Sequence, residues 1–171
     1  MRVLRTRGFT LLEVLIALLV FSLGLVGMAG LMVVSVRTNH SAYMRSQANF
    51  IAQGMADRMR ANLPGVWANS YNSAAYPLTG AVPNCSTGCT PADLATRDQI
   101  LWSNQLTTFL PNSAASIACV LGVAVPAGVV TADLRPPYSG VCTMSITWDE
   151  SPLDMNAASN TRQTFAWVFQ P

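Results

Sequence analysis

Residues 8–36 read GFTLLEVLIALLVFSLGLVGMAGLMVVSV. No charged side chain occurs between Val14 and Val36, a stretch that exceeds the ~20 apolar residues needed to cross a bilayer as a helix. A short basic segment precedes it, with arginines at Arg2, Arg5 and Arg7. Because positively charged flanks stay on the cytoplasmic side, the sequence predicts a cytoplasmic N-terminus and an exported remainder.

Glu13 at the start of this span distinguishes three interpretations. A cleaved secretory signal fits the basic start, but the apolar run is too long and lacks a clean small-residue cleavage site. A plain single-pass anchor has no use for a carboxylate at this depth. The third interpretation gives Glu13 a cationic partner, which is the usual reason for an acid in a membrane segment.

The string Gly8-Phe9-Thr10-Leu11-Leu12-Glu13-Val14, between a basic leader and an uncharged span, resembles the class III signal of type IV pilins and pseudopilins. The resemblance implies that a prepilin peptidase and methyltransferase removes residues 1–8, cleaves after Gly8 and N-methylates Phe9. Glu13 then has two possible partners: the Phe9 amine of its own chain, four residues earlier on one helix face, or the Phe9 amine of a neighbouring subunit.

Three glycines lie inside the span, at Gly24, Gly27 and Gly30. Each costs a helix about 1 kcal/mol relative to alanine. One interpretation is close packing against other helices through small residues. The other is a segment that softens when the subunit leaves the lipid for a filament.

Helical periodicity continues beyond the span, which predicts one helix from about Phe9 to about Ala61, followed by Pro64-Gly65. Residues 9–36 form its membrane or filament-core half. Residues 37–171 are expected to form an exported domain, in which the second half of the helix packs on the sheet. A polar segment, 62–91, is expected to be a loop whose aromatics Trp67, Tyr71 and Tyr76 either pin it to the body or present a contact surface.

The rest of the domain is predicted to contain a short helix at about 92–110, begun by Thr90 and Pro91. Alternating residues then predict antiparallel strands within about 117–169, including the apolar run 117–125 and a pair joined by a long polar loop. The expected fold class is α+β, a long N-terminal helix packed on a small antiparallel sheet. The resemblance likewise implies a type IV pilin-like fold.

All four cysteines lie on the exported side: Cys85, Cys89, Cys119 and Cys142. An even number in an oxidising compartment favours disulfides. Of the three possible pairings we favour Cys85–Cys89 with Cys119–Cys142, because the last two lie in predicted strands. A zinc site of four cysteines is the rival, which spacing and compartment disfavour.

Charge and motifs exclude several functions. The chain contains no lysine, which P-loop NTPases, protein kinases and Schiff-base enzymes require. From Arg37 onward arginines and acids are equal in number, so no nucleic-acid partner is expected. A single histidine, His40, makes neither a triad nor a metal site. The acids Asp149, Glu150 and Asp154 are weak calcium candidates. No enzyme activity, metal or cofactor is expected.

The chain also resembles the PilV group of minor pilins, in Gly8–Met32, Ser46–Asn62, Cys142–Glu150 and Thr164–Pro171. The resemblance implies a subunit that primes pilus assembly with other minor pilins and the major pilin, sits at the tip with an adhesin, and supports adhesion and twitching motility. It implies an inner-membrane protein with a periplasmic domain until processing. The alternatives are a pseudopilin of a type II secretion system and a membrane-anchored adhesive module.

Overall fold

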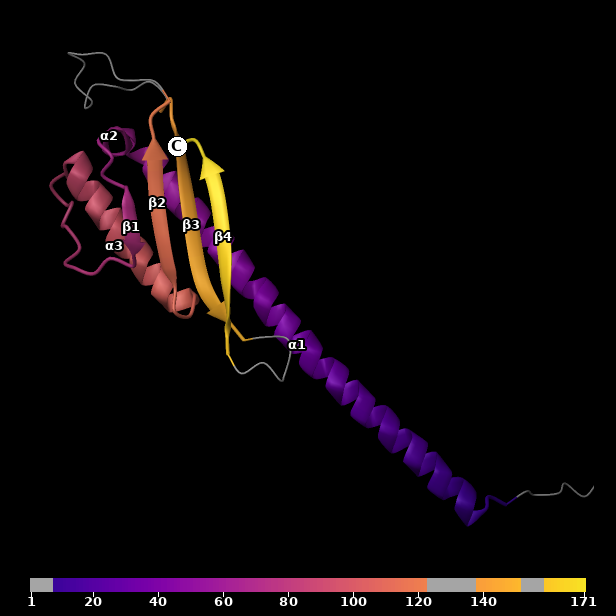
Figure 1. Cartoon of the computed structure of the whole chain (residues 1–171). Helices are drawn as coiled ribbons and strands as arrows, with labels where there is room; N and C mark the ends of the chain where they lie inside the picture. The colour runs from indigo at the N-terminus through magenta and orange to yellow at the C-terminus, as the bar shows by residue number, and fades with distance from the viewer. Residues whose placement is uncertain (1–7, 123–137, 152–158) are drawn as a thin grey trace, which may run out of the picture. The chain divides into compact units, whose positions relative to one another are not determined.

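The computed structural model describes residues 8–122, 138–151 and 159–171. The chain divides into two units, Met1–His40 and Ser41–Pro171. The described elements are, in chain order, α1 (Leu11–Ala61), α2 (Leu63–Trp67), β1 (Ser73–Tyr76), α3 (Pro91–Phe109), β2 (Ala114–Val120), β3 (Val141–Glu150) and β4 (Thr161–Phe169) (Figure 1). A long N-terminal helix followed by a small antiparallel sheet confirms the expected α+β class.

The described part of the first unit, residues 8–40, contains one element, the first part of α1. Its apolar side chains between Leu11 and Val36 are exposed. The helix is long and apolar enough, by length and composition, to cross a membrane. A surface this apolar requires lipid or protein against it, since soluble proteins rarely expose continuous apolar patches of this size.

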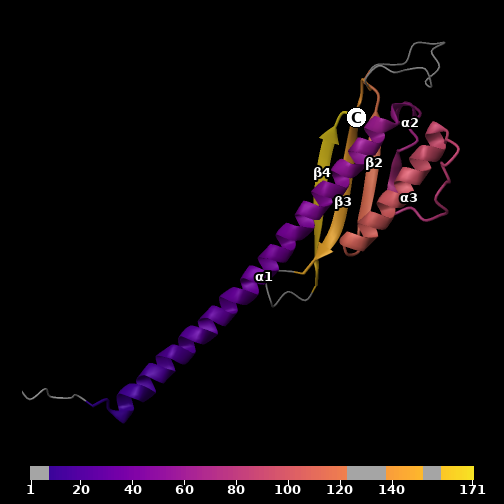
Figure 2. The same ribbon diagram turned by 180° about the vertical axis from the view of Figure 1, so that it is seen from behind.

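In the second unit one side of α1 is buried and forms part of the hydrophobic core. Figure 2 shows its Ser41–Ala61 part lying across one face of the sheet. The predicted helical periodicity is confirmed, because the buried residues of α1 recur at helical spacing: Met44, Ala48, Ile51, Ala52, Met55, Ala56 and Met59. They meet the inward side chains of the sheet, which include Ile117, Met144, Ile146 and Trp148.

The expectation of a continuous loop over 62–91 is wrong, since this segment contains α2 and β1. Asn62 explains the new helix: its Oδ1 accepts the Gly65 N–H at 3.3 Å, and its Nδ2 donates to Pro91 O at 2.8 Å. A Cβ on Gly65 would lie 2.5 Å from Asn62 Nδ2, so a larger residue there would displace the Asn62 side chain. Pro64-Gly65, expected to end the first helix, therefore belongs to the next one.

The aromatic residues of this segment pin it to the body of the domain and do not form an exposed contact surface. Trp67, Tyr71 and Tyr76 are all buried. The Tyr71 hydroxyl donates to Asp98 Oδ2 at 2.8 Å, and the Tyr76 hydroxyl donates to Tyr71 O at 2.8 Å. Burial raises the pKa of Tyr76 to about 12 and raises the pKa of Tyr71 further above its usual value.

Helix α3 begins one residue earlier than expected and ends at Phe109. Thr90 caps it, with Oγ1 accepting the Asp93 N–H at 3.2 Å. Trp102, fully buried, donates from Nε1 to Ile51 O of α1 at 3.0 Å and meets Tyr76 edge-on at 5.0 Å between ring centroids. This side chain therefore joins α3, α1 and the end of β1.

The four strands form one antiparallel sheet in the order β1-β2-β3-β4. Strand β2 runs from Ala114 to Val120, so it starts before the expected run at 117. Residues 123–125 of that run lie outside the described part of the chain. The pair β3 and β4, joined by a long connection, agrees with the prediction.

The structure contains two disulfides, Cys85–Cys89 and Cys119–Cys142, the pairing that the sequence analysis favours. No free cysteine remains, so a zinc site of four thiolates is excluded. Cys119 and Cys142 lie directly opposite each other on β2 and β3. The second bridge thus closes the connection between the two central strands.

We expect the two bridges to differ in their effect on stability. Replacing Cys119 and Cys142 together by alanine should lower the free energy of unfolding by about 3 kcal/mol, because a loop of this length is constrained in the unfolded chain. Replacing Cys85 and Cys89 together is the matched control and should cost clearly less, since its loop is shorter. Urea unfolding of the full chain in detergent measures both. Equal losses would contradict the prediction.

Candidate assembly site

Thr10 caps the start of α1, close to the predicted cleavage bond. Its carbonyl accepts the N–H groups of Glu13 at 3.1 Å and Val14 at 3.3 Å, and its Oγ1 accepts the Glu13 N–H at 3.3 Å. Threonine followed three residues later by glutamate is the capping-box pattern, a signal that could have located this start from the sequence. Gly8 and Phe9 consequently lie before the helix.

The expected helix start at about Phe9 is therefore two residues too early. In the unprocessed chain the Phe9 nitrogen belongs to a peptide bond and carries no charge. An ionic contact between Phe9 and Glu13 thus requires cleavage first. A contact on one helix face also requires α1 to extend back through Thr10.

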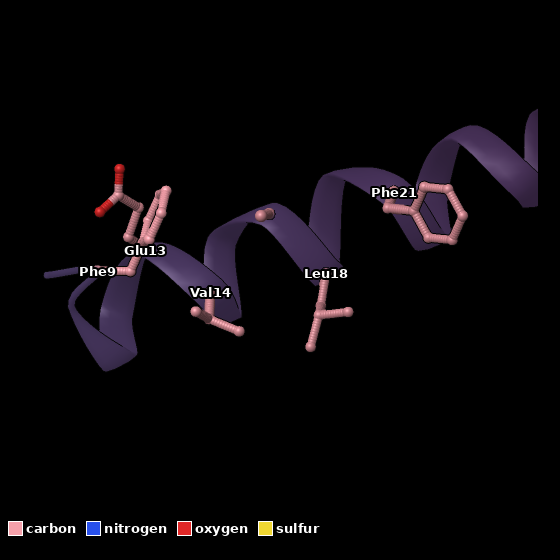
Figure 3. A pocket seen from close by; sticks show the side chains of 6 residues that line it. Phe9, Glu13, Val14, Leu18 and Phe21 are labelled. Atoms are coloured by element: carbon pink, nitrogen blue, oxygen red, sulfur yellow. The ribbon is translucent and has the colours of Figure 1, made fainter.

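Phe9 and Glu13 lie beside each other at the beginning of α1 (Figure 3). Both side chains are exposed, Phe9 at 83%. With four residues of the next turns they line a shallow, open, almost entirely apolar hollow along the helix, the others being Val14, Ala17, Leu18 and Phe21. Glu13 is the one ionisable group in this set. An exposed carboxylate on an apolar helix surface needs a cation wherever lipid or protein covers that surface.

The glycines Gly24, Gly27 and Gly30 lie within the uninterrupted helix α1. A Cβ built on any of them meets no atom within 4 Å. No contact among the residues that the structure describes therefore demands glycine at these positions. Close packing against another subunit and softening of the helix both stay predictions.

His40 is exposed. Across residues 8–122, 138–151 and 159–171 no group of three His, Cys, Asp or Glu side chains is placed to hold a metal ion. Asp154, one of the three calcium candidates, lies outside the described residues.

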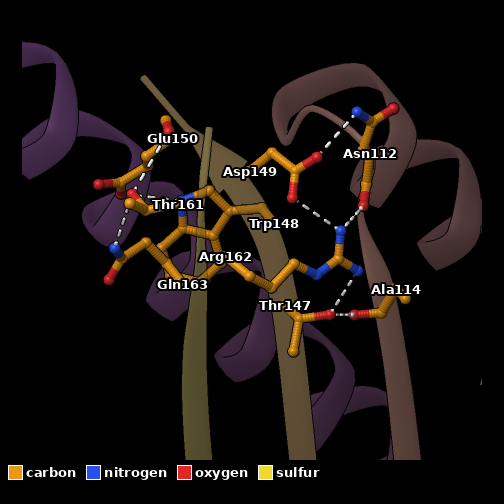
Figure 4. A network of polar contacts seen from close by, with 9 residues as sticks. All are labelled: Asn112, Ala114, Thr147, Trp148, Asp149, Glu150, Thr161, Arg162 and Gln163. Atoms are coloured by element: carbon orange, nitrogen blue, oxygen red, sulfur yellow. Dashed lines mark hydrogen bonds and ion pairs between the residues drawn. The ribbon is translucent and has the colours of Figure 1, made fainter. Parts of the chain in front are cut away.

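The other two acids of that candidate set take part in separate structural contacts (Figure 4). Asp149 accepts from Asn112 Nδ2 at 2.9 Å and from Arg162 Nη1 at 3.0 Å. Glu150 is buried and accepts from Ser41 Oγ of α1 and from Trp148 Nε1, each at 2.9 Å. The two carboxylates thus point to different faces of the strand, as expected of neighbours in a strand.

The Asp149 contacts predict a dependence of stability on acid pH. The hydrogen bond from Asn112, followed by that from Arg162, lowers the pKa of Asp149 below its usual value. Its stabilising contribution is therefore present above that value and is lost as the pH falls through the lower pKa of the folded state. Asp149→Asn should make the melting temperature fall less than that of the parent chain when the pH is lowered from about 5 to about 2. A variant with the slope of the parent chain would contradict this assignment.

Two family models match the chain. The prokaryotic N-terminal methylation motif matches residues 4–29. The model described as type IV pilin Tt1218 matches residues 30–100, from the last part of the apolar span into α3. The chain is a type IV pilin. No curated protein and no solved structure matches this pilin.

Family membership accounts for the main features described above. The fold is the type IV pilin-like α+β fold, and the pilin family match suggests a structural protein. The methylation motif implies processing by a prepilin peptidase and assembly into a pilus with other pilins. The motif and the apolar part of α1 fit a protein that is first anchored in a membrane and then incorporated into the pilus.

Proposed function

We propose that this pilin is a minor pilin of the PilV group that helps to start pilus assembly. In this proposal the peptidase cleaves between Gly8 and Phe9 and methylates Phe9. The processed subunit joins other minor pilins in a priming complex at the pilus tip, in contact with the major pilin and a tip adhesin. Adhesion and twitching motility then depend on it.

The observation that carries the assembly step is the isolation of Glu13. From Phe9 to Val36 it is the one charged side chain, on a helix surface that is otherwise apolar and exposed. Cleavage after Gly8 creates an amine four residues from this carboxylate. Opposite charges attract strongly where water is excluded. A subunit whose Glu13 meets the Phe9 amine of its neighbour would thereby be held in one axial register.

The disulfides of the Ser41–Pro171 unit support the proposal that this part of the subunit faces an oxidising compartment. Its four cysteines are consumed in two disulfides, which persist outside the cytoplasm. The basic leader favours a cytoplasmic N-terminus. We therefore place the N-terminus in the cytoplasm and the Ser41–Pro171 unit in the periplasm before assembly.

The PilV assignment rests on the sequence resemblance in α1 and in the last two strands. The adhesive-module alternative depended on exposed aromatics in the 62–91 segment, but Trp67, Tyr71 and Tyr76 are buried. The pseudopilin alternative shares the leader and the helix, so only the phenotype separates it from the pilus assignment.

Deleting the gene provides that phenotype. We expect surface pili and twitching to be lost, protein secretion to continue, and the full chain supplied in trans to restore both. Quantitative mass spectrometry of sheared pili should find this chain far below the major pilin in amount. Loss of secretion with normal pili would overturn the proposal in favour of a pseudopilin. Amounts equal to the main subunit would overturn the minor role.

A further inference from the structure

Strand β4 forms a long, regular edge of the sheet (Figure 1). It has 9 residues and pairs with β3 without a break from Cys142↔Phe169 to Glu150↔Thr161. Within the described ranges no strand pairs with its other edge. The opposite edge, β1, has 4 residues, an irregular register and Pro77 directly after it. Short and irregular edges discourage strand pairing, whereas long regular ones invite it.

The backbone groups that β4 offers can be assigned from the other side of the sheet. The Cys119 N–H donates to Asn72 Oδ1 at 2.9 Å, and Cys119 O accepts from Asn72 Nδ2 at 3.4 Å. Cys119 and Cys142 therefore form a non-hydrogen-bonded pair, so the backbone groups of Cys142 face β4. Alternation along the strands then directs four residues of β4 to the outer edge: Arg162, Thr164, Ala166 and Val168.

Apolar side chains flank these backbone groups on both faces of the sheet. Phe165 and Trp167 pack against the core and stay partly exposed. Trp167 stacks on Phe169 with ring centroids 4.7 Å apart, and Val168 on the other face is 60% exposed. An added strand would bury this surface.

Nothing within β4 protects the edge. The strand contains no proline, glycine or lysine. Its one charged residue, Arg162, is directed over the sheet, where it donates to Asn112 O at 2.7 Å, Asp149 Oδ1 at 3.0 Å and Thr147 Oγ1 at 2.8 Å (Figure 4). The charge that proteins commonly use to block strand pairing is thus engaged elsewhere.

Arg45 of α1 adds a charge beside this edge. It donates to Gln163 Oε1 at 3.3 Å. Among the described residues no carboxylate lies within ion-pair distance of Arg45. A carboxylate on an added strand, placed near Gln163, would therefore meet a cation. Strand β4 itself contains no acid, so a second copy of β4 cannot supply this partner.

We infer that the β4 edge accepts an extended segment of a different protein, which adds to the sheet as a fifth strand. Its backbone bonds the four outward residues, its apolar side chains cover Phe165 and Trp167, and an acidic residue pairs with Arg45. The inference needs only the folded Ser41–Pro171 unit and does not depend on the minor-pilin assignment.

Photo-crosslinking in the native host tests this inference. Thr164 is replaced by p-benzoylphenylalanine in the full chain, and adducts are mapped by mass spectrometry. We expect an adduct with one extended segment of another protein. Ala166→Pro, which removes one outward N–H without touching the ladder to β3, should lower its yield about tenfold. Ala166→Ser, which keeps the N–H, should leave it unchanged.

Arg45 provides a second arm that does not perturb the strand. Arg45→Gln should lower the adduct yield about two- to fivefold, the effect of an exposed ion pair, while Arg45→Lys should preserve it. The Cys119–Cys142 disulfide and the melting temperature report whether each variant folds. Adducts with this chain alone, no adduct, or a yield indifferent to both Ala166→Pro and Arg45→Gln would overturn the inference.

Discussion

Glu13→Leu should remove this subunit from sheared pili while leaving the protein in the membrane and its leader cleaved. The carboxylate lies on an exposed apolar helix surface beside Phe9, where a processed neighbour would bring its amine. An opposite-charge contact at about 4 Å is worth about 4 kcal/mol where the effective dielectric constant is about 20. A third of that energy already corresponds to about a tenfold change in incorporation.

The matched variants for this prediction are Glu13→Gln and Glu13→Asp. Glutamine keeps the size and removes the charge, so it should behave like leucine. Aspartate keeps the charge on a shorter side chain, so it should retain part of the incorporation. Immunoblots of the sheared fraction and of the membrane fraction measure all three. Normal incorporation of the glutamine variant would contradict an electrostatic role of Glu13.

Trp102→Ala should produce the largest loss of stability in the Ser41–Pro171 unit. The ring is fully buried, meets Tyr76 edge-on and bonds Ile51 O of α1. Removing a buried aromatic leaves a cavity that costs about 3–5 kcal/mol. Urea unfolding of the full chain in detergent, followed by the fluorescence of the remaining tryptophans, measures it.

Trp102→Phe separates the two contributions of this side chain. It keeps an aromatic ring and removes the hydrogen bond to Ile51 O. The lost hydrogen bond should lower the free energy of unfolding by about 1–2 kcal/mol, in addition to the loss caused by the smaller ring. Phe109→Ala at the end of the same helix is a control, because that side chain is 45% exposed. A loss for Trp102→Ala no larger than that of the control would contradict the core described above.

The long periodic elements could be predicted because their burial pattern is visible in the sequence. The stripe from Met44 to Met59 and the alternation in 141–148 each repeat often enough to fix the type of element. The segment 62–91 could not be read this way. Helix α2 is one turn held by the side chain of Asn62, and β1 has 4 residues that pair with β2 far along the chain. Both depend on tertiary contacts.

The residues of the candidate site could be predicted from the sequence motif, but their arrangement in space could not. The residues Gly8, Phe9 and Glu13 stand out by their order and by the absence of other charges. The start of the helix at Leu11 depends on Thr10, whose capping contacts with Glu13 and Val14 fix it. The position of β4 at the sheet edge, with Arg45 beside Gln163, follows only from the assembled sheet.

Processing of this pilin into an assembly subunit can be read from the mass of the native chain. Intact mass and N-terminal peptide mapping are applied to unreduced protein from the native envelope. We expect a chain that begins at N-methylated Phe9 and carries two disulfides. A chain that still begins at Met1, or one cut near Ala29, would contradict processing at Gly8 and the role given to Glu13.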